Sequence, residues 1–174
     1  VQLHIKAPEA VARQLWKHCV GLSGTSADRS IDTGWNEASR RYVVIDDFHH
    51  PKDFRYQSKS SKQASQYDEN GNPIVFPQDR AEEFHKLWEE HETKTRELIA
   101  YFLEQGMARE QAQMLLPLSF YTEWYWTASF QALAHLRDLR VDNHAQWEAQ
   151  QYGLAIEQIL RTLYPKTSEI WFGN

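Results

Sequence analysis

The chain has 174 residues, of which 41% are hydrophobic and 13% aromatic, so its apolar surface suffices for one core and we expect a single domain over residues 1–174. A net charge of −5 at pH 7 argues against polymeric nucleic acid as a partner, because surfaces that bind it are basic. The single cysteine excludes an intramolecular disulfide framework, and no apolar run is long enough for a membrane span, so we expect a cytoplasmic protein.

The first third of the chain predicts a strand, a helix and a loop. Residues 1–6 alternate as a strand does, and the chain starts there without a Met. Pro8 stands where a helix begins, and Val11, Leu15 and Trp16 recur at helical spacing up to residue 18. Residues 20–34 are rich in Gly, Ser, Thr and Asp and indicate a loop.

The middle of the chain predicts a strand, a polar stretch and a long helix. Residues 42–48 are β-branched and aromatic, as is typical of a strand, whereas residues 51–72 are polar and end in a turn signal. Asp79 followed by Glu82 predicts the cap of a long helix, and Gly106 predicts its end.

The last third predicts three further helices. The first covers residues 109–116 and ends at Pro117, and the second covers about 121–137. The third covers about 143–164 and is closed by Pro165. We expect an α+β fold in which a small, mainly antiparallel sheet is packed by long helices.

A cluster of polar and basic side chains follows the loop. The sequence Asn36-Glu-Ala-Ser-Arg-Arg41 offers two guanidinium groups, a hydroxyl and a carboxylate. Arginine binds phosphate oxygens bidentately and the serine hydroxyl adds a donor, so the cluster suits a phosphate. The alternative interpretation is a solvated arginine pair beside a helix cap.

Two stretches together resemble the flavin-dependent thymidylate synthases: Trp35-Asn-Glu-Ala-Ser-Arg-Arg-Tyr42 and Leu139-Arg-Val-Asp-Asn-His-Ala-Gln-Trp-Glu148. Residues 11–16, 105–112 and 121–127 also follow the pattern of that family in order, so the similarity spans nearly the whole chain. The family has a further N-terminal portion before the point where this chain starts, and we expect the chain to be a fragment.

The resemblance implies which residues form the site. It implies that Arg140 and Ser39 are catalytic. The residues implied to bind the substrate, deoxyuridine monophosphate (dUMP), are Gln14, Ser39, Arg40, Arg41, Gln113 and Arg140. The residues implied to bind the cofactor, flavin adenine dinucleotide (FAD), are Lys17, His18, Cys19, Asn36, Glu37, Ser129, Gln131, His135 and His144.

The resemblance also implies the reaction. A methylene group passes from methylenetetrahydrofolate to the uracil ring and is reduced by a flavin hydride, with NAD(P)H as the source of electrons and thymidine monophosphate (dTMP) as the product. It further implies a homotetramer with flavin sites at the subunit junctions. Arg140 suits its implied role, because a fixed guanidinium stabilises negative charge that develops on the pyrimidine oxygens. The alternative is that Arg140 only caps helix carbonyls.

The chain departs from the family pattern at several positions. Lys17 and Cys19 replace two arginines, and Gln113 replaces a substrate-facing arginine. Ser129 and Gln131 replace an Asn and an Arg associated with flavin, and residues 20–34 form a loop insertion. Two alternatives therefore stay open: a relative that leaves another group, such as hydroxymethyl, on C5 of dUMP, and a noncatalytic nucleotide-binding or assembly subunit.

Cysteine and histidine residues suggest other chemistry. Cys19 lies beside Lys17 and His18, whose charge lowers a thiol pKa, but a lone helical cysteine is more often a small core residue than a nucleophile. His85 with Glu89, and His144 with Glu148, have the i, i+4 spacing of metal ligands without a third ligand set by spacing. We expect no metal site.

Overall fold

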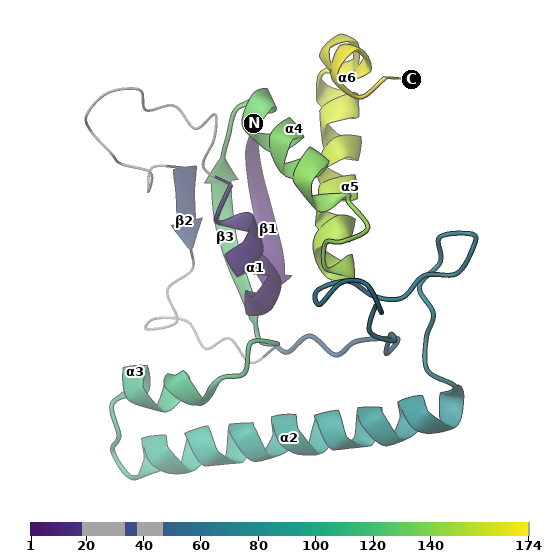
Figure 1. Cartoon of the computed structure of the whole chain (residues 1–174). Coiled ribbons are helices and arrows are strands. Elements are labelled where there is room, and N and C mark those ends of the chain that lie inside the picture. Colours follow the sequence, from purple (N-terminus) through teal and green to yellow (C-terminus); the bar gives the residue numbers. More distant parts are fainter. Residues whose placement is uncertain (19–33, 38–46, 174) are drawn as a thin grey trace.

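The computed structural model describes residues 1–18, 34–37 and 47–173 (Figure 1). Its elements form a small antiparallel sheet with helices packed on it, which confirms the predicted α+β class. In chain order the elements are β1 (Gln2–Pro8), α1 (Glu9–Leu15), β2 (Trp35–Glu37), α2 (Gln78–Glu104), α3 (Arg109–Ala112), the 3-10 helix η2 (Gln113–Leu115), β3 (Tyr121–Thr127), α4 (Phe130–Arg140), α5 (Trp147–Leu163) and α6 (Pro165–Phe172).

The sheet has the order β1-β3-β2, with β3 in the centre and both neighbours antiparallel to it. The register pairs Gln2 with Thr127 at one end of β1 and Pro8 with Tyr121 at the other. Every second residue of β1 is buried, as the period of a half-buried strand requires. The opening strand predicted from the sequence is therefore confirmed.

Tryptophans fill the core between the sheet and the helices. Trp124 and Trp126 of β3 are almost fully buried on the face that α1, α4 and α5 cover. Trp35 of β2 stacks on both, with ring centroids 4.5 Å from Trp126 and 5.3 Å from Trp124. Trp16 meets Trp124 edge-on at 5.9 Å. Each such pair adds about 0.5–1.5 kcal/mol beyond its burial, so the cluster fixes the start of the chain against β3.

The predicted helix over residues 121–137 is wrong in its first half. Residues 121–127 form β3, and the helix α4 begins only at Phe130. The aromatic and β-branched residues of β3 alternate between buried and more exposed positions, so the tertiary packing favours a strand. Ser129 then starts the helix, because its side chain accepts a hydrogen bond from the backbone N–H of Ala132 at 3.1 Å.

Two helix boundaries also differ from the prediction. The long helix α2 is confirmed and ends before Gly106, whose φ of 84° suits glycine, but Pro77 rather than Asp79 is the N-cap. Pro165 does not merely close α5, since it opens the additional helix α6. The short helix over 109–116 is confirmed as α3 followed by η2. Most of the predicted loop over 20–34 and most of the predicted strand over 42–48 lie outside the described residues.

Residues 54–76, here called the 54–76 segment, connect the sheet region to α2 without a regular strand. Isolated bridges hold the segment together, with Arg55 opposite Val75, Gln57 opposite Ser65 and Tyr67 opposite Pro73. The segment runs beneath the start of α5 before it reaches α2 (Figure 1). This path brings polar loop residues close to the connection between α4 and α5.

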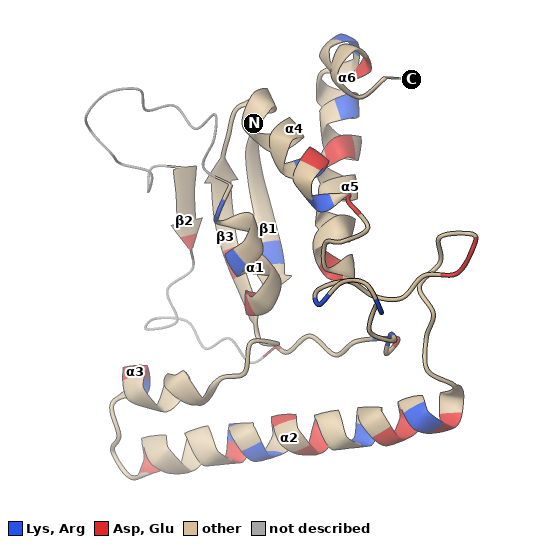
Figure 2. Cartoon of the chain, in the orientation of Figure 1, with Lys and Arg blue, Asp and Glu red and all other residues tan. Residues whose placement is uncertain are grey.

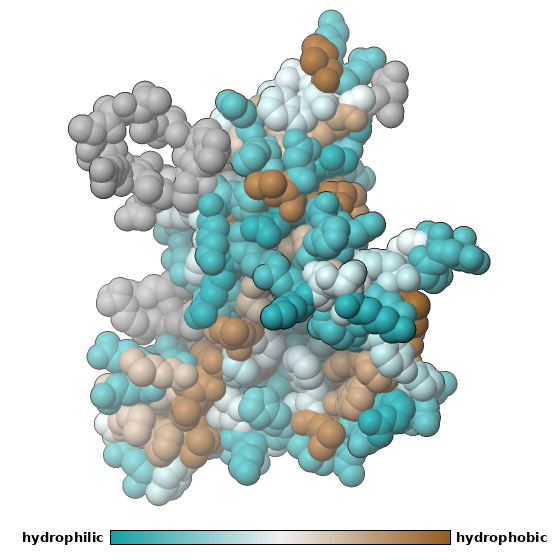
Figure 3. All heavy atoms as spheres, in the orientation of Figure 1, coloured by the Kyte–Doolittle hydropathy of each residue, from teal (hydrophilic) through white to brown (hydrophobic). Residues whose placement is uncertain are grey.

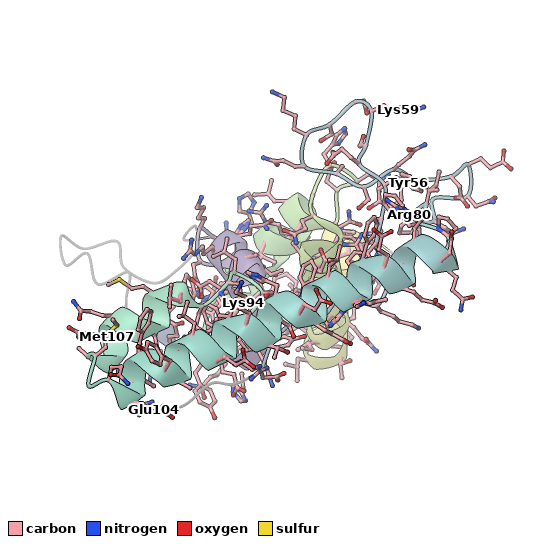
Figure 4. All side chains as sticks on the ribbon, turned by 90° about the horizontal axis from the view of Figure 1, so that it is seen from below. Tyr56, Lys59, Arg80, Lys94, Glu104 and Met107 are labelled. Atoms are coloured by element: carbon pink, nitrogen blue, oxygen red, sulfur yellow. The ribbon has the colours of Figure 1, made fainter. Side chains whose placement is uncertain are left out.

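The helix α2 runs along one side of the molecule and has 27 residues, of which only Thr95 is buried (Figures 1 and 4). Charged residues of both signs alternate along it (Figure 2), and apolar side chains gather around α2 and α3 on the surface (Figure 3). Among the exposed apolar residues are Leu87, Leu98 and Tyr101. No helix in the described ranges is long and apolar enough to span a membrane.

Candidate functional site

A polar cleft of about 460 Å³ lies where α1 ends, α4 ends and the 54–76 segment approaches α5. It contains two cationic side chains and amide groups, and none of its described lining residues is acidic. Such a lining attracts an anion, because no carboxylate among the described lining residues offsets the charges of Lys17 and Arg140. The lining residues are Gln14, Lys17, Gln63, Arg140, Ala145 and Gln146.

Arg140 is held in this cleft from the last turn of α4. Its Nε donates a hydrogen bond to His18 Nε2 at 2.8 Å, and its Nη2 donates one to the Gln14 carbonyl oxygen at 3.2 Å. A guanidinium has five N–H donors, and these two contacts with described residues engage two of them. The other donors can bind a ligand. Partial burial lowers the pKa of Arg140, which stays protonated at neutral pH.

His18 supports Arg140 as a neutral acceptor. The side chain is buried, and this burial, followed by the charges of Arg140 and His135, lowers the pKa of His18 from 6.5 to about 4. At neutral pH its Nε2 therefore carries a lone pair, which accepts the hydrogen bond from Arg140. The ring also meets His135 edge-on, with centroids 6.4 Å apart.

A chain of hydrogen bonds leads away from the cleft. Gln14 Nε2 donates to Gln146 Oε1 at 2.6 Å, and Gln146 Nε2 donates to Glu148 Oε2 at 2.9 Å. Glu148 also pairs with Arg55, which lies over the Trp147 ring at 4.8 Å. Burial alone would raise the pKa of Glu148, but hydrogen bonds from Gln146 and Arg55 outweigh it and the pKa is lowered. The carboxylate is therefore ionised at neutral pH.

Glycine allows the close helix packing that places Arg140. Gly153 of α5 faces the end of α4, and a Cβ at this position would lie 2.9 Å from Val141 Cγ2 and 3.4 Å from Arg140 Cβ. A larger residue would therefore push α4 and α5 apart. The absence of a side chain at Gly153 sets the position from which Arg140 enters the cleft.

The structure brings together some of the site residues predicted from the sequence. Gln14, Lys17 and Arg140 line the cleft, and His18 contacts Arg140 from below the surface. His135 lies next to His18. These five residues come from α1, the turn after it, and α4, which are far apart in the sequence.

Other predicted residues lie elsewhere in the single chain. Asn36 and Glu37 are on β2, where Glu37 Oε1 accepts a hydrogen bond from Thr122 Oγ1 at 2.5 Å, and they line a separate hollow of about 320 Å³ with residues of β1 and β3. Ser129 and Gln131 lie at the N-terminal end of α4, about 17 and 14 Å along the helix from Arg140 by the rise per residue.

Two more predicted residues are also outside this cleft. Gln113 begins η2, which packs with α2 and α3. His144 is exposed on the connection between α4 and α5, and its backbone N–H and Nδ1 both contact Asp142 Oδ1, at 2.7 and 2.8 Å. The remaining predicted residues, Cys19, Ser39, Arg40 and Arg41, lie outside the described residues.

The histidines considered as metal ligands have other contacts. His85 Nδ1 lies 2.7 Å from His50 Nε2, and Glu148 is engaged by Arg55 and Gln146 rather than by His144. Within the ranges that the structure describes, no three His, Cys, Asp or Glu side chains are grouped so that they could hold a metal ion.

Residues without a marked signal in the sequence also shape the cleft. Gln146 and Glu148 belong to the motif over residues 139–148, but the resemblance implies no role for Gln146, and the spacing of Glu148 from His144 suggests only a metal pair. Gln63 and Arg55 lie in the polar stretch that was predicted only as a connection. No local pattern marks Arg55, because its partner Glu148 is 93 positions away.

The chain is similar to known proteins over nearly its whole length. The family model described as thymidylate synthase complementing protein matches residues 1–166. A flavin-dependent thymidylate synthase of Kosmotoga olearia is 37% identical over 169 residues, which cover 97% of this chain and 65% of the relative. One of Thermus thermophilus is 36% identical over 165 residues, which cover 94% of this chain and 53% of the relative. The chain thus spans between about half and two thirds of the length of these curated relatives.

A solved structure has the same fold. It is a UMP/dUMP methylase, PolB, from Streptomyces cacaoi bound with 5-Br UMP, with a TM-score of 0.74 and 22% sequence identity. The match covers 97% of this chain and 70% of that chain. Since the family model covers almost all of the sequence and the relatives share more than a third of their aligned residues, the chain belongs to the flavin-dependent thymidylate synthase family.

Proposed function

We propose that this chain forms part of a flavin-dependent enzyme that converts dUMP to dTMP, with methylenetetrahydrofolate as carbon donor and NAD(P)H as reductant. The observation that carries the proposal is the Arg140 cleft, in which Lys17 and Arg140 are cationic and no other described lining residue is charged. The names of the relatives and their shared sequence support the same reaction.

Arg140 has the chemistry to stabilise the substrate during the reaction. Its Nε and one Nη2 hydrogen are held by His18 and the Gln14 carbonyl, so the guanidinium is fixed before a ligand arrives. A donor that needs no reorganisation stabilises negative charge developing on a pyrimidine oxygen, and removal of one such donor typically costs about 100- to 1,000-fold in rate.

The described residues fit a flavin nucleotide in one respect. FAD carries a pyrophosphate, and the exposed Lys17 at the cleft edge offers an ammonium group to it. The bound flavin would supply the hydride that completes the methyl group. The neutral His18 accepts the hydrogen bond from Arg140 and so holds the guanidinium in place.

We also propose that the active form is a homotetramer. Gln113, Asn36 and Gln131 do not line the Arg140 cleft within one chain, although the family resemblance assigns them to one site. Neighbouring subunits would supply them. An apolar groove of about 570 Å³ between α2 and residues 117–119 offers a surface for such assembly. Sedimentation of the purified chain measures its mass in solution, and a stable monomer would contradict this part of the proposal.

Enzyme assays test the reaction directly. We expect the purified full chain to bind flavin, to show its visible absorption, and to form labelled dTMP when methylenetetrahydrofolate and NADPH are present. Arg140→Lys should reduce the rate at least about 100-fold, whereas Arg80→Lys, an exposed arginine on α2, should leave it unchanged. An oxygenated product would instead favour hydroxymethylation. A colourless protein that does not bind dUMP would overturn the proposal.

A further inference from the structure

The buried carboxylate of Glu148 sets the direction of the hydrogen bonds around it. Its side chain is 11% exposed, one oxygen pairs with Arg55, and the other accepts from Gln146 Nε2 at 2.9 Å. An ionised carboxylate has no hydrogen to donate. Gln146 must therefore turn its NH₂ group, and not its oxygen, toward Glu148.

The orientation of the Gln146 amide determines the orientation of the Gln14 amide. Since the NH₂ group of Gln146 faces Glu148, its Oε1 faces Gln14 and accepts a hydrogen bond from Gln14 Nε2 at 2.6 Å. Gln14 Nε2 also donates to the backbone carbonyl oxygen of Ala10 at 3.1 Å. Both amide hydrogens of Gln14 are thus engaged, and what this side chain offers to the cleft is its acceptor Oε1.

We propose that Arg55, Glu148 and Gln146 are positioning residues that fix the polarity of Gln14, and that Gln14 Oε1 recognises an N–H or O–H donor of the bound nucleotide. This inference rests on the proposed function, because it takes dUMP as the ligand. Gln14 then selects nucleotides that present a hydrogen-bond donor to its Oε1, next to the charged donors of Arg140.

The polarity decides which part of dUMP Gln14 contacts. A phosphate at neutral pH presents mainly acceptor oxygens, which an amide oxygen repels, so Gln14 does not bind the phosphate. Two groups of dUMP are donors, the N3–H of uracil and the 3′-hydroxyl of the sugar. Arg140 lies beside Gln14, since its Nη2 donates to the Gln14 carbonyl oxygen at 3.2 Å. Either donor of dUMP is compatible with this neighbour, because carbonyl oxygens flank the N3–H and the oxygen of the 3′-hydroxyl is itself an acceptor.

Binding measurements with analogues separate these two donors. Calorimetry on the full chain with saturating FAD would compare dUMP with 3-methyl-dUMP, which lacks the N3–H, and with 2′,3′-dideoxyuridine monophosphate, which lacks the hydroxyl. The variants are Gln146→Leu, which interrupts the relay but keeps the Arg55 pair, and Glu148→Gln, whose amide lets the relay reverse. Gln151→Leu is the control, since it makes the same replacement at an exposed position of α5. Thermal melting checks that each variant is folded.

We expect one analogue to bind the unmodified chain about tenfold more weakly than dUMP, the effect of one unpaired hydrogen bond. That ratio should fall below about threefold in Gln146→Leu and in Glu148→Gln, and persist in Gln151→Leu. A purely steric effect of the added methyl group would persist in all variants and would overturn the inference, as would equal binding of all three ligands. If the unmodified chain binds no dUMP, the proposed function itself fails, which is a different result from dUMP binding without discrimination.

Discussion

Replacement of Gly153 by alanine tests whether close packing of α4 and α5 holds Arg140 in place. The added Cβ would lie 2.9 Å from Val141 Cγ2, and valine has few rotamers with which to move aside. Overpacking of this kind costs about 1–3 kcal/mol, whereas alanine gains about 1 kcal/mol of helix propensity over glycine. We therefore expect Gly153→Ala to lower the free energy of unfolding by up to about 2 kcal/mol and to weaken dUMP binding.

A second background makes this test sharper. Val141→Ala removes the Cγ2 atom, so in that background Gly153→Ala should raise the free energy of unfolding by up to about 1 kcal/mol through helix propensity alone. Urea unfolding of the four proteins measures both effects. If alanine at 153 destabilises the two backgrounds by the same amount, contact with Val141 is not the cause and the reasoning is refuted.

Two further predictions concern the ionisable groups of the site. Because the pKa of His18 is lowered from 6.5 to about 4, the unfolded chain binds its proton at higher pH, and stability present above pH 6.5 is lost as the pH falls toward 4. Between pH 7 and 5, the free energy of unfolding measured with urea should fall by at most about 1.4 kcal/mol per pH unit because of His18. In His18→Gln this part of the pH dependence should disappear, and an unchanged slope in the variant would contradict the assignment. Arg55→Met leaves the Glu148 charge unpaired and should cost about 3 kcal/mol, with part of the loss recovered in Arg55→Met/Glu148→Gln. Additive losses in a double-mutant cycle would show that the two side chains do not interact.

The sequence predicts correctly those helices and strands whose apolar residues recur with a clear period. The prediction is wrong where one apolar pattern runs across two elements. The strand β1 and the helices α2 and α5 have a clear period of 2 or 3.6 residues, and the structure confirms them. The stripe from Tyr125 through Ala128 to Leu136 has helical spacing, yet it crosses from β3 into α4. Ser129, a good N-cap residue, was the local signal that could have located the boundary.

The candidate site could be predicted only in part. The resemblance selected Gln14, Lys17 and Arg140, which the structure places in one cleft. It gave no role to Arg55, because the contact with Glu148 depends on how the 54–76 segment folds back toward α5. A pairing set by tertiary structure leaves no periodic or spacing signal in a single sequence.

The central position of β3 has a consequence for synthesis of the protein. Gln2 of β1 pairs with Thr127 of β3, 125 positions later, so β1 leaves the ribosome long before its partner is made. At about 5–20 residues per second this delay is on the order of ten seconds. During that time the apolar side chains of β1 have no sheet to join, so we expect the nascent chain to depend on chaperones until translation reaches β3.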